Sequence, residues 1–415
     1  MELKDYIVGM ACAARKASVG LRTLTADAKN AALVAMAASI DARRAEIKTA
    51  NARDVEGGRK AGLSSALLDR LTLTDARIDG MIASLKDIAA FDDPVGELIG
   101  TRRPEGFVLE KVRTPIGVIV MIYESRPNVT VDAAALCVKS GNAAILRGGS
   151  EAMESSRELV RCIREGLARA GVDGNAVQYV DRPDYEAIDL LVSQTGLVDL
   201  VVPRGGEKLI QRVVDKATVP DIKHFKGVCH IYVDETADLS MAADVIVNSK
   251  VQRPGTCNAL EKLLVHSSVA GRLLPMVKEK MPTVELRGDT RAIAILPGTK
   301  PATEEDWYAE YLDLILTVKV VDGLDEAAAH IETYGSRHTD GICSNSSRNI
   351  ERFVSLVDSA VLTVNASTRM SDGGVFGLGA EVGISTDKLH ARGPMGLKEL
   401  TTYKWVLRGD GNLRK

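Results

Sequence analysis

The middle of the chain alternates short apolar runs with longer helix-like segments, and this alternation constrains the fold more than any other feature. Four runs have the length and composition of buried strands, at residues 118–123, 143–146, 176–180 and 197–202. Helical segments lie between them, for example at about 130–140 and 150–170. Buried strands that alternate with helices form parallel sheets. The sequence therefore predicts an α/β protein with parallel strands.

The first hundred residues are predicted to be mainly helical. Residues from about 25 to 56 are rich in alanine and place Leu33, Ile40 and Ile47 at helical spacing. Thr74 then provides a capping signal for a second apolar helix. A loop follows, and the run at 107–112 predicts a strand ahead of the alternating region.

The bulk composition excludes several classes of partner. The chain has 415 residues and a formal net charge of −3, so we expect neither nucleic acid nor a membrane among its partners. Six cysteines at irregular spacing, with no C-x-x-C pair, predict no disulfide framework and no metal site. The N-terminal residues lack a signal peptide, and no apolar run is long enough to span a membrane. These features predict a cytoplasmic enzyme.

One cysteine differs from the other five in its surroundings. Cys257 lies in a polar stretch that Pro254 and Gly255 interrupt, with Lys250 and Arg253 nearby. The others lie in or beside apolar runs: Cys12, Cys137, Cys162, Cys229 and Cys343. Apolar surroundings are the default for a buried thiol, whereas a thiol on a turn near cations can react as the thiolate. Cys257 is therefore the candidate nucleophile.

Two glycine-rich loops repeat a local pattern. Arg147-Gly148-Gly149-Ser150 and Arg204-Gly205-Gly206 each follow a predicted strand and open a helix. Glycines let the backbone approach a ligand, and a helix N-terminus binds phosphate through its N–H groups. Such loops at one edge of a sheet are compatible with a nucleotide site or with simple tight turns. The sequence alone leaves both interpretations open.

The family resemblance depends on longer motifs. The order and spacing of residues 115–119, 140–151 and the Cys257 loop resemble the aldehyde dehydrogenase superfamily. Three more specific segments resemble its gamma-glutamyl phosphate reductase branch: Tyr123-Glu124-Ser125-Arg126-Pro127-Asn128-Val129-Thr130, Gln252-Arg253-Pro254-Gly255-Thr256-Cys257-Asn258, and residues 389–405. The resemblance spans essentially the whole chain.

That resemblance implies a fold, a reaction and a cofactor. We expect two parallel-sheet α/β domains with a small β arm, and reduction of L-glutamyl 5-phosphate to L-glutamate 5-semialdehyde. Cys257 would form a thioester and release phosphate, and the reductant would be NADP(H). Arg147 in place of an acidic residue after its strand favours NADP(H) over NAD(H). Glutamate 5-kinase, which supplies the acyl phosphate, is an expected transient partner.

The resemblance also implies site residues beyond the cysteine. Asn128 and the Cys257 N–H would stabilise the oxyanion, and Glu310 would hold the nicotinamide ribose. The amino-acid end of the substrate would meet Asn365, Ser367 and Arg369. The phosphate group also needs a cation, and the candidates are Arg126, Lys250 or Arg253.

The sequence also departs from the superfamily ahead of Cys257. Hydrolytic members carry a glutamate base in the stretch that here reads Lys223-His224-Phe225-Lys226-Gly227. Without that carboxylate, we expect an enzyme that does not pass its thioester to water. His224 is open to two interpretations, as a general acid or base and as a packing or surface residue.

By analogy with the superfamily, residues 1–100, 115–230 and 366–400 would form the cofactor-binding domain. Residues 231–365 would form the catalytic domain, and 101–114 with 401–415 an oligomerisation arm. Closed homo-oligomers are the usual outcome for such arms, so a homodimer or homotetramer is expected. Three alternatives stay open at this point: a CoA-acylating or other oxidising aldehyde dehydrogenase, a thiol-dependent hydrolase or acyltransferase, and a non-catalytic cofactor-binding protein.

Overall fold

The computed structural model describes residues 1–104, 106–124 and 126–414 and divides the chain into two compact units. Unit 1 contains Met1–Lys223, Gly377–Gly383 and Met395–Lys415, and unit 2 contains His224–Phe376 and Ile384–Pro394. Glu105 and Lys415 of the predicted arm, and Ser125 of the motif that precedes Asn128, lie outside the described residues. Each unit has its own parallel sheet.

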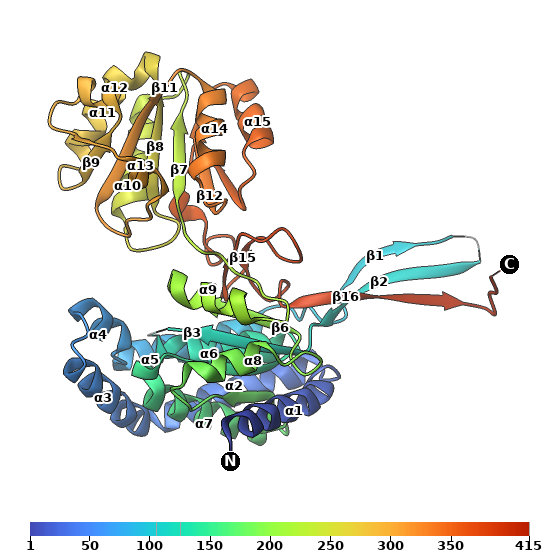
Figure 1. Cartoon of the computed structure of the whole chain (residues 1–415). Coiled ribbons are helices and arrows are strands. Elements are labelled where there is room, and N and C mark those ends of the chain that lie inside the picture. The colour runs from blue at the N-terminus through green and yellow to red at the C-terminus, as the bar shows by residue number, and fades with distance from the viewer. Residues whose placement is uncertain (105, 125, 415) are drawn as a thin grey trace. The chain divides into compact units, whose positions relative to one another are not determined.

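The sheet of unit 1 has four parallel strands in the order β5-β4-β3-β6 (Figure 1). They are β3 (Val118–Tyr123), β4 (Ala143–Arg147), β5 (Val177–Tyr179) and β6 (Leu200–Arg204). All residues of β3 are buried, as its continuous apolar run predicted. Since β3 pairs in parallel with both β4 and β6, the carboxyl ends of these strands lie at one edge of the sheet.

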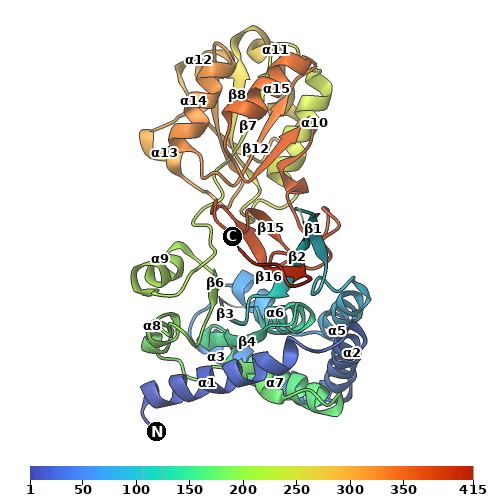
Figure 2. The same cartoon turned by 90° about the vertical axis from the view of Figure 1, so that its right-hand side faces the viewer.

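Helices cover this sheet and form a further layer behind it. They are α1 (Leu3–Leu21), α2 (Ala26–Ala42), α3 (Arg44–Lys60), α4 (Ser65–Leu71), α5 (Asp75–Ala90), α6 (Pro127–Lys139), α7 (Met153–Arg169), α8 (Tyr185–Val192) and α9 (Glu207–Lys216). α6 packs against β3 and β4, and α1 contacts the same two strands. α2 contacts α5, α6 and α7, and Figure 2 shows α2 and α5 side by side.

The helical run predicted for residues 25–56 was wrong in one respect, because it is two helices. α2 ends at Ala42, the φ of −115° and ψ of 27° at Arg43 leave the helical region, and α3 begins at Arg44. The Arg43 guanidinium donates to both carboxylate oxygens of Glu165 on α7, at 2.9 and 2.7 Å. This bidentate pair fixes the corner between the two helices. The predicted cap is confirmed, since the Thr74 hydroxyl accepts from the Arg77 N–H.

Three antiparallel strands form a separate ribbon within unit 1. The order is β1-β2-β16, with β1 (Leu98–Arg102), β2 (Phe107–Pro115) and β16 (Thr401–Gly409). Nine residues of β16 pair with nine of β2, which are nearly 300 positions away in sequence. Figure 1 shows the ribbon extending away from the helices of its own unit. The strand predicted at 107–112 is therefore present and pairs with the C-terminal strand, while the oligomerisation role of this arm stays a prediction.

Unit 2 is a seven-stranded parallel sheet between two helical layers. The order is β10-β9-β11-β8-β7-β12-β13. The strands are β7 (Cys229–Val233), β8 (Leu260–His266), β9 (Glu285–Gly288), β10 (Lys300–Pro301), β11 (Ile315–Val321), β12 (Thr339–Cys343) and β13 (Val361–Val364). The helices are α10 (Leu239–Val251), α11 (Ser267–Lys280), α12 (Thr290–Ile295), α13 (Glu304–Tyr308), α14 (Leu324–Tyr334) and α15 (Ser347–Leu356).

Two apolar clusters in unit 2 correspond to the two faces of its sheet. One contains residues of α10, α11 and α12, and the other contains residues of α14 and α15. Figure 1 shows these helices on opposite sides of the sheet. The short strands β14 (Gly383–Ser385) and β15 (Gly393–Met395) pair separately. Within the described ranges, no helix combines the length and apolar composition needed to cross a membrane.

The two units differ from the predicted division in three places. The boundary falls between Lys223 and His224, seven residues earlier than predicted, because the segment before β7 packs with unit 2. Residues 366–376 and 384–394 also cluster with unit 2, not with the glycine-rich loops. Contacts between Ser367 and Ser249, and between Arg392 and Asp358, explain this placement.

Candidate active site

Cys257 lies on a short polar turn between α10 and β8, and its side chain is half-buried. The turn is closed by the Ala259 N–H, which donates to the Thr256 carbonyl at 3.0 Å. The Thr256 hydroxyl contacts the Arg253 carbonyl and the Asn258 amide oxygen, each at 2.9 Å. These local hydrogen bonds satisfy the polar groups of a turn that belongs to no helix or strand, and they fix the position of the Cys257 thiol.

The other cysteines have different surroundings. Burial raises the pKa of Cys137, Cys162 and Cys343 to about 12, and burial also raises the pKa of Cys229. Cys12 is exposed on α1, within unit 1. The four buried thiols are therefore poor nucleophiles near neutral pH, which leaves Cys257 as the candidate with a half-buried thiol.

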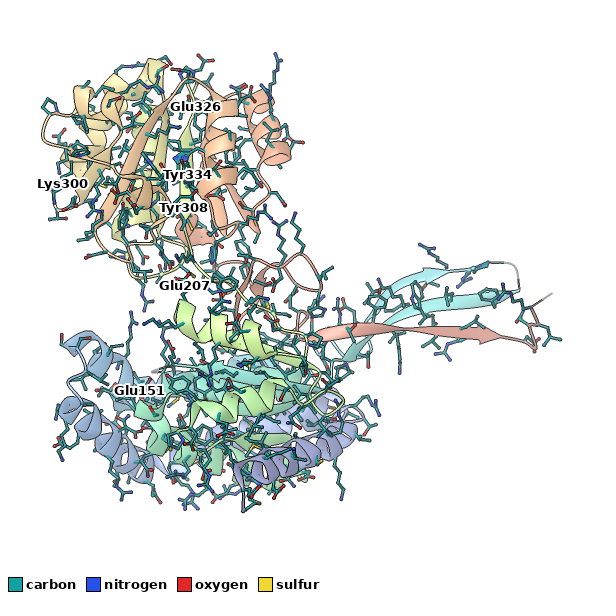
Figure 3. The ribbon with its side chains drawn as sticks, in the orientation of Figure 1. Glu151, Glu207, Lys300, Tyr308, Glu326 and Tyr334 are labelled. Carbon is teal, nitrogen blue, oxygen red and sulfur yellow. The ribbon has the colours of Figure 1, made fainter. Side chains whose placement is uncertain are left out.

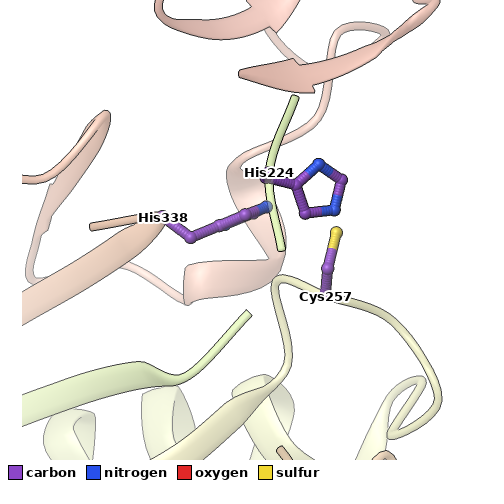
Figure 4. Close-up of side chains that lie close together, drawn as sticks. All are labelled: His224, Cys257 and His338. Carbon is purple, nitrogen blue, oxygen red and sulfur yellow. The ribbon is translucent and has the colours of Figure 1, made fainter. Parts of the chain in front are cut away.

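Three segments of unit 2 meet at the amino-terminal edge of its sheet. His224 precedes β7, Cys257 precedes β8 and His338 directly precedes β12. These strands are parallel neighbours, so their amino ends are adjacent. One ring nitrogen of each histidine and the Cys257 Sγ lie within 4.8 Å of one another (Figure 4). The rings of His224 and His338 meet edge to face, with centroids 5.3 Å apart.

The contacts of His224 define its tautomer. Its Nδ1 lies 2.8 Å from the Ile384 carbonyl oxygen. Because a carbonyl only accepts, Nδ1 carries a proton, and in the neutral imidazole Nε2 presents its lone pair. Figure 4 shows a ring nitrogen of His224 next to the Cys257 sulfur. A neutral imidazole with a lone pair beside a thiol is an arrangement that can move a proton.

A close backbone contact locks the His224 segment against the cysteine. A Cβ atom on Gly227 would lie 1.7 Å from the Cys257 carbonyl oxygen, so only glycine fits. The Gly227 N–H donates to Glu310 Oε1 at 2.9 Å, and the Cys229 thiol donates to the Cys257 carbonyl at 3.2 Å. Glu310 thus positions the loop that packs on Cys257, and its binding of the cofactor ribose stays a prediction.

Arg369 lies at the same edge as Cys257. Its Nη1 donates to the Asn258 amide oxygen, and its Nε donates to Gln252 at 2.9 Å. Ser367 accepts from the Arg369 N–H at 3.2 Å and from the Ser249 hydroxyl at 3.0 Å, which fixes the turn. Burial and then the Arg253 charge lower the pKa of Arg369.

Asn365 lies at the opposite edge of the unit 2 sheet. It follows the carboxyl end of β13, and its side chain both accepts from the Ser344 N–H and donates to the Ser344 carbonyl at 2.9 Å. Its φ of 50° is a conformation that asparagine tolerates. Asn365 therefore closes the end of β12, and the structure does not bring it together with Cys257 and Arg369.

The cations predicted to bind the phosphate group lie in different parts of the structure. Lys250 is fully buried, and its ammonium pairs with Glu261 at 3.1 Å. It points into the interior, so its predicted availability beside the thiol was wrong. Arg253 is exposed on the Cys257 turn. Arg126 is exposed at the start of α6 in unit 1.

In unit 1 the first glycine-rich loop follows β4. Arg147 is almost buried and donates to the carbonyls of Gly148 and Pro183, both at 3.0 Å. A Cβ on Gly148 would lie 3.2 Å from the Tyr123 ring, and one on Gly149 would lie 2.2 Å from the Glu151 carboxylate. Figure 3 labels Glu151 in unit 1. Ser150 begins the next turn and is exposed. Arg147 therefore organises the loop through its backbone carbonyls.

The second loop follows β6 and holds a carboxylate. The Gly206 N–H donates to Glu124 Oε2 at 2.9 Å. A Cβ on Gly205 would lie 2.6 Å from the Glu124 carboxyl carbon, whereas one on Gly206 would have 3.9 Å. Arg204 packs against Gly383 of the same unit. The loop thus has a backbone donor that already binds an anionic oxygen.

Asn128 is exposed in the first turn of α6, where its amide hydrogen-bonds Asp132. Burial raises the pKa of Asp132. This placement leaves the predicted oxyanion role of Asn128 a proposal.

Sequence reasoning missed His338 and did not settle His224. The sequence signal for His224 was its position, since it stands where hydrolytic relatives place a glutamate. For His338 no local signal exists, because a histidine before a strand is usually a packing residue. Its proximity to Cys257 comes from the pairing of β12 with β7, and of β7 with β8.

Comparisons with known proteins agree with this architecture. Residues 4–305 match the aldehyde dehydrogenase family. The chain is 49% identical to the gamma-glutamyl phosphate reductases of Geotalea daltonii and Geobacter metallireducens, over 100% of this chain and of each relative. A crystal structure of gamma-glutamyl phosphate reductase from Thermotoga maritima is 47% identical, with a TM-score of 0.97 over 99% of this chain and 100% of that one.

Two parallel-sheet units and a half-buried cysteine on a turn between a helix and a strand define an aldehyde dehydrogenase fold, and the chain belongs to this family of oxidoreductases. The relatives that are 49% identical over the full length both carry the name of one branch of this family. Within the family, the chain falls among the gamma-glutamyl phosphate reductases, which confirms the resemblance predicted from its motifs.

Proposed function

We propose that this chain reduces L-glutamyl 5-phosphate to L-glutamate 5-semialdehyde with NADPH, the second step of proline biosynthesis from glutamate. The observation that carries the proposal is the half-buried Cys257 thiol with an imidazole lone pair beside it. The names of the two full-length relatives support the same substrate.

His224 supplies the base for the first step. Because its Nδ1–H is engaged by the Ile384 carbonyl, Nε2 takes the thiol proton and leaves a thiolate beside an imidazolium. The thiolate attacks the acyl phosphate carbonyl, an S–C bond forms, and the C–O bond to phosphate breaks. A thioester on Cys257 and inorganic phosphate result.

The second step reduces the thioester. A nicotinamide cofactor, when bound, supplies the hydride. As the C–S bond breaks and the aldehyde forms, His224 returns its proton to the Cys257 sulfur. The Cys257 N–H and the Asn128 amide are the proposed donors to the oxyanion in both steps.

The loops of unit 1 fit a nucleotide cofactor. The Gly206 N–H that donates to the Glu124 carboxylate can donate equally to a phosphate oxygen once Glu124 turns away. Neighbouring side chains already pack closely against Gly205 and Gly148, so a side chain at either position would displace the loop that carries the glycine. We propose that both loops, Arg147 to Ser150 and Arg204 to Gly206, contact the cofactor, with Glu310 on its ribose. The preference for NADP(H) is proposed from the absence of an acidic residue directly after β4.

The amino-terminal edge of unit 2 also provides substrate-binding groups. We propose that Arg369, held by Ser367, binds the α-carboxylate of the substrate, and that Arg253 and Arg126 bind the phosphate. Asn365 would act only indirectly, by holding the end of β12. The β1-β2-β16 ribbon is proposed as the contact of a homodimer or homotetramer. A transient contact with glutamate 5-kinase and a cytoplasmic location complete the proposal.

The test is the reverse reaction, in which NADP⁺ reduction is followed with glutamate 5-semialdehyde, with and without phosphate. Steady turnover that requires phosphate is expected, because phosphate must discharge the thioester. Equal steady-state rates without phosphate would mean that water or another acceptor resolves the thioester, and would contradict the proposed reaction. Turnover that requires coenzyme A in place of phosphate would favour the CoA-acylating alternative.

A further inference from the structure

We propose that His224, Cys257 and His338 together bind one Zn²⁺ ion, which reversibly blocks the thiol. The three side chains come from three separate strand ends, so no sequence spacing indicates the site. One ring nitrogen of each histidine and the Cys257 Sγ lie within 4.8 Å of one another (Figure 4). A thiolate and two imidazoles form the kind of ligand set that zinc prefers.

Hydrogen bonds prepare both imidazoles as ligands. His224 Nδ1 donates to the Ile384 carbonyl, which leaves Nε2 as the metal-binding nitrogen. His338 Nδ1 lies 2.8 Å from the Thr339 hydroxyl, which itself donates to Ser371 at 3.0 Å. Because the Thr339 proton goes to Ser371, Nδ1 of His338 is the donor and Nε2 again presents its lone pair. Backbone or side-chain oxygens on the second nitrogen are typical of zinc-bound histidines.

The distances require only a small closure. Zinc bonds of about 2.0–2.3 Å at tetrahedral angles place neighbouring ligand atoms about 3.3–3.6 Å apart. From a separation of at most 4.8 Å, the atoms would approach by no more than about 1.5 Å. Cys257 and His224 are half-buried, so rotation of these two side chains can provide the closure, while buried His338 stays in place.

The charges around the site select the type of ion. Arg369 contacts Asn258, the residue next to Cys257, and its positive charge opposes any dication. A hard ion such as Mg²⁺ depends on carboxylate oxygens, and none joins this cluster within the described residues. An ion that bonds strongly to thiolate and imidazole, such as Zn²⁺, is favoured over Mg²⁺ and Ca²⁺.

Binding has a defined chemical consequence. The Cys257 S–H bond breaks, the proton goes to solvent, and the sulfur lone pair forms the bond to the metal. The same lone pair would attack the substrate, so a bound ion and an acyl group exclude each other. Three protein ligands leave the fourth position to water. The site therefore inhibits the enzyme, and its existence does not depend on the proposed substrate.

The experiment is a titration of the metal-free, full-length protein with Co²⁺, whose thiolate charge-transfer absorption reports a bond to cysteine. One Co²⁺ per chain with that absorption is expected, followed by displacement with one equivalent of Zn²⁺. Cys257→Ala should abolish the absorption. His224→Ala and His338→Ala should each weaken binding at least about tenfold. Saturating Zn²⁺ should also protect Cys257 from alkylation.

Matched variants keep the test decisive. Cys12→Ala removes an exposed thiol, and His266→Asn removes an imidazole at the start of α11 while keeping its capping role. Both should bind Co²⁺ as the wild type does. If buried His338→Ala fails to fold, half-buried His224→Ala still tests the site. An absorption that survives Cys257→Ala, unchanged affinity in His224→Ala, or no Zn²⁺ binding at one per chain would overturn the proposal.

Discussion

The two parallel sheets use opposite edges for their polar groups. In unit 1, the two glycine-rich loops follow the carboxyl ends of β4 and β6, and the second offers the Gly206 backbone N–H. In unit 2, Cys257, His224 and His338 precede β8, β7 and β12, and they offer side chains at the amino-terminal edge.

The comparison teaches which part of a site follows from topology. Ligand sites at carboxyl ends are general for open α/β sheets, so unit 1 follows a rule that sequence patterns can express. The unit 2 cluster depends on particular contacts, such as the Gly227 backbone against the Cys257 carbonyl. A site built from backbone N–H groups should tolerate most side-chain substitutions, whereas a site built from side chains should lose its function when a single residue is replaced.

The largest expected effect is at Cys257. Cys257→Ala removes the proposed nucleophile and should lower kcat by about 10³-fold or more, because the thiol that forms the thioester is lost. Cys137→Ala removes a buried thiol whose pKa is about 12, and should leave the chemistry near wild type. Comparable losses in steady-state assays of both variants would contradict the nucleophile assignment.

A change at Gly227 should be the next largest. A Cβ there would lie 1.7 Å from the Cys257 carbonyl oxygen, so Gly227→Ala must displace the turn that holds the thiol. A shift of about 1 Å is expected to cost about 10²-fold in kcat/KM. The control is Gly271→Ala on α11, where a Cβ meets nothing within 4 Å. If Gly227→Ala retains wild-type kcat/KM, the backbone contact does not position Cys257.

Unit 1 offers a smaller test at Gly205 and Gly206. Gly205→Ala places a Cβ 2.8 Å from the Leu209 side chain on α9, a contact that remains when Glu124 turns away, and should displace the loop and weaken NADPH binding about tenfold. Gly206→Ala, whose Cβ would lie 3.9 Å from Glu124, should change the Kd less than about twofold. Fluorescence titration with NADPH measures both. A wild-type Kd for Gly205→Ala would contradict the proposal that this loop contacts the cofactor.

The smallest effect concerns a titration confined to unit 2. His330 on α14 is 3% exposed, and within the described chain neither ring nitrogen has a hydrogen-bond partner. It packs edge to face against Trp307 and Tyr334, the latter labelled in Figure 3. Burial, and then the neighbouring His230, lower the pKa of His330 to about 3.

The direction of this pH effect follows from proton binding. Between the ordinary histidine pKa of about 6.5 and the folded value of about 3, the unfolded chain binds a proton that the folded protein does not. Stability is therefore full above about pH 6.5 and falls by about 1 kcal/mol per pH unit below it. Between pH 7.5 and 5, the melting temperature of His330→Phe should fall by less than that of the wild type. Parallel losses would show that His330 does not titrate on unfolding.

The fold was largely predictable, because apolar periodicity reports burial directly. The strand at 118–123 and the cap at Thr74 have the predicted positions. The break at Arg43 was not predictable, since no glycine or proline marks it and a distant carboxylate, Glu165, fixes it. Long-range contacts of that kind leave no local pattern.

The site was predictable only where chemistry is local. Cys257 was identified from its polar, broken surroundings, and its turn has that character. Lys250 and Asn365 looked equally available in sequence, yet Lys250 is buried against Glu261 and Asn365 closes the far edge of the sheet. His338 joins Cys257 through strand order alone.

The most direct test of the account is a count of the acyl-enzyme formed in the absence of phosphate. Enzyme mixed with glutamate 5-semialdehyde and excess NADP⁺ should form one NADPH per Cys257 in a single burst and then stop. Intact-mass analysis should find one glutamyl group on the chain, absent in Cys257→Ala, and added phosphate should discharge it and restore turnover. Continuous NADPH production without phosphate, or a burst without a glutamyl group on Cys257, would contradict the thioester mechanism.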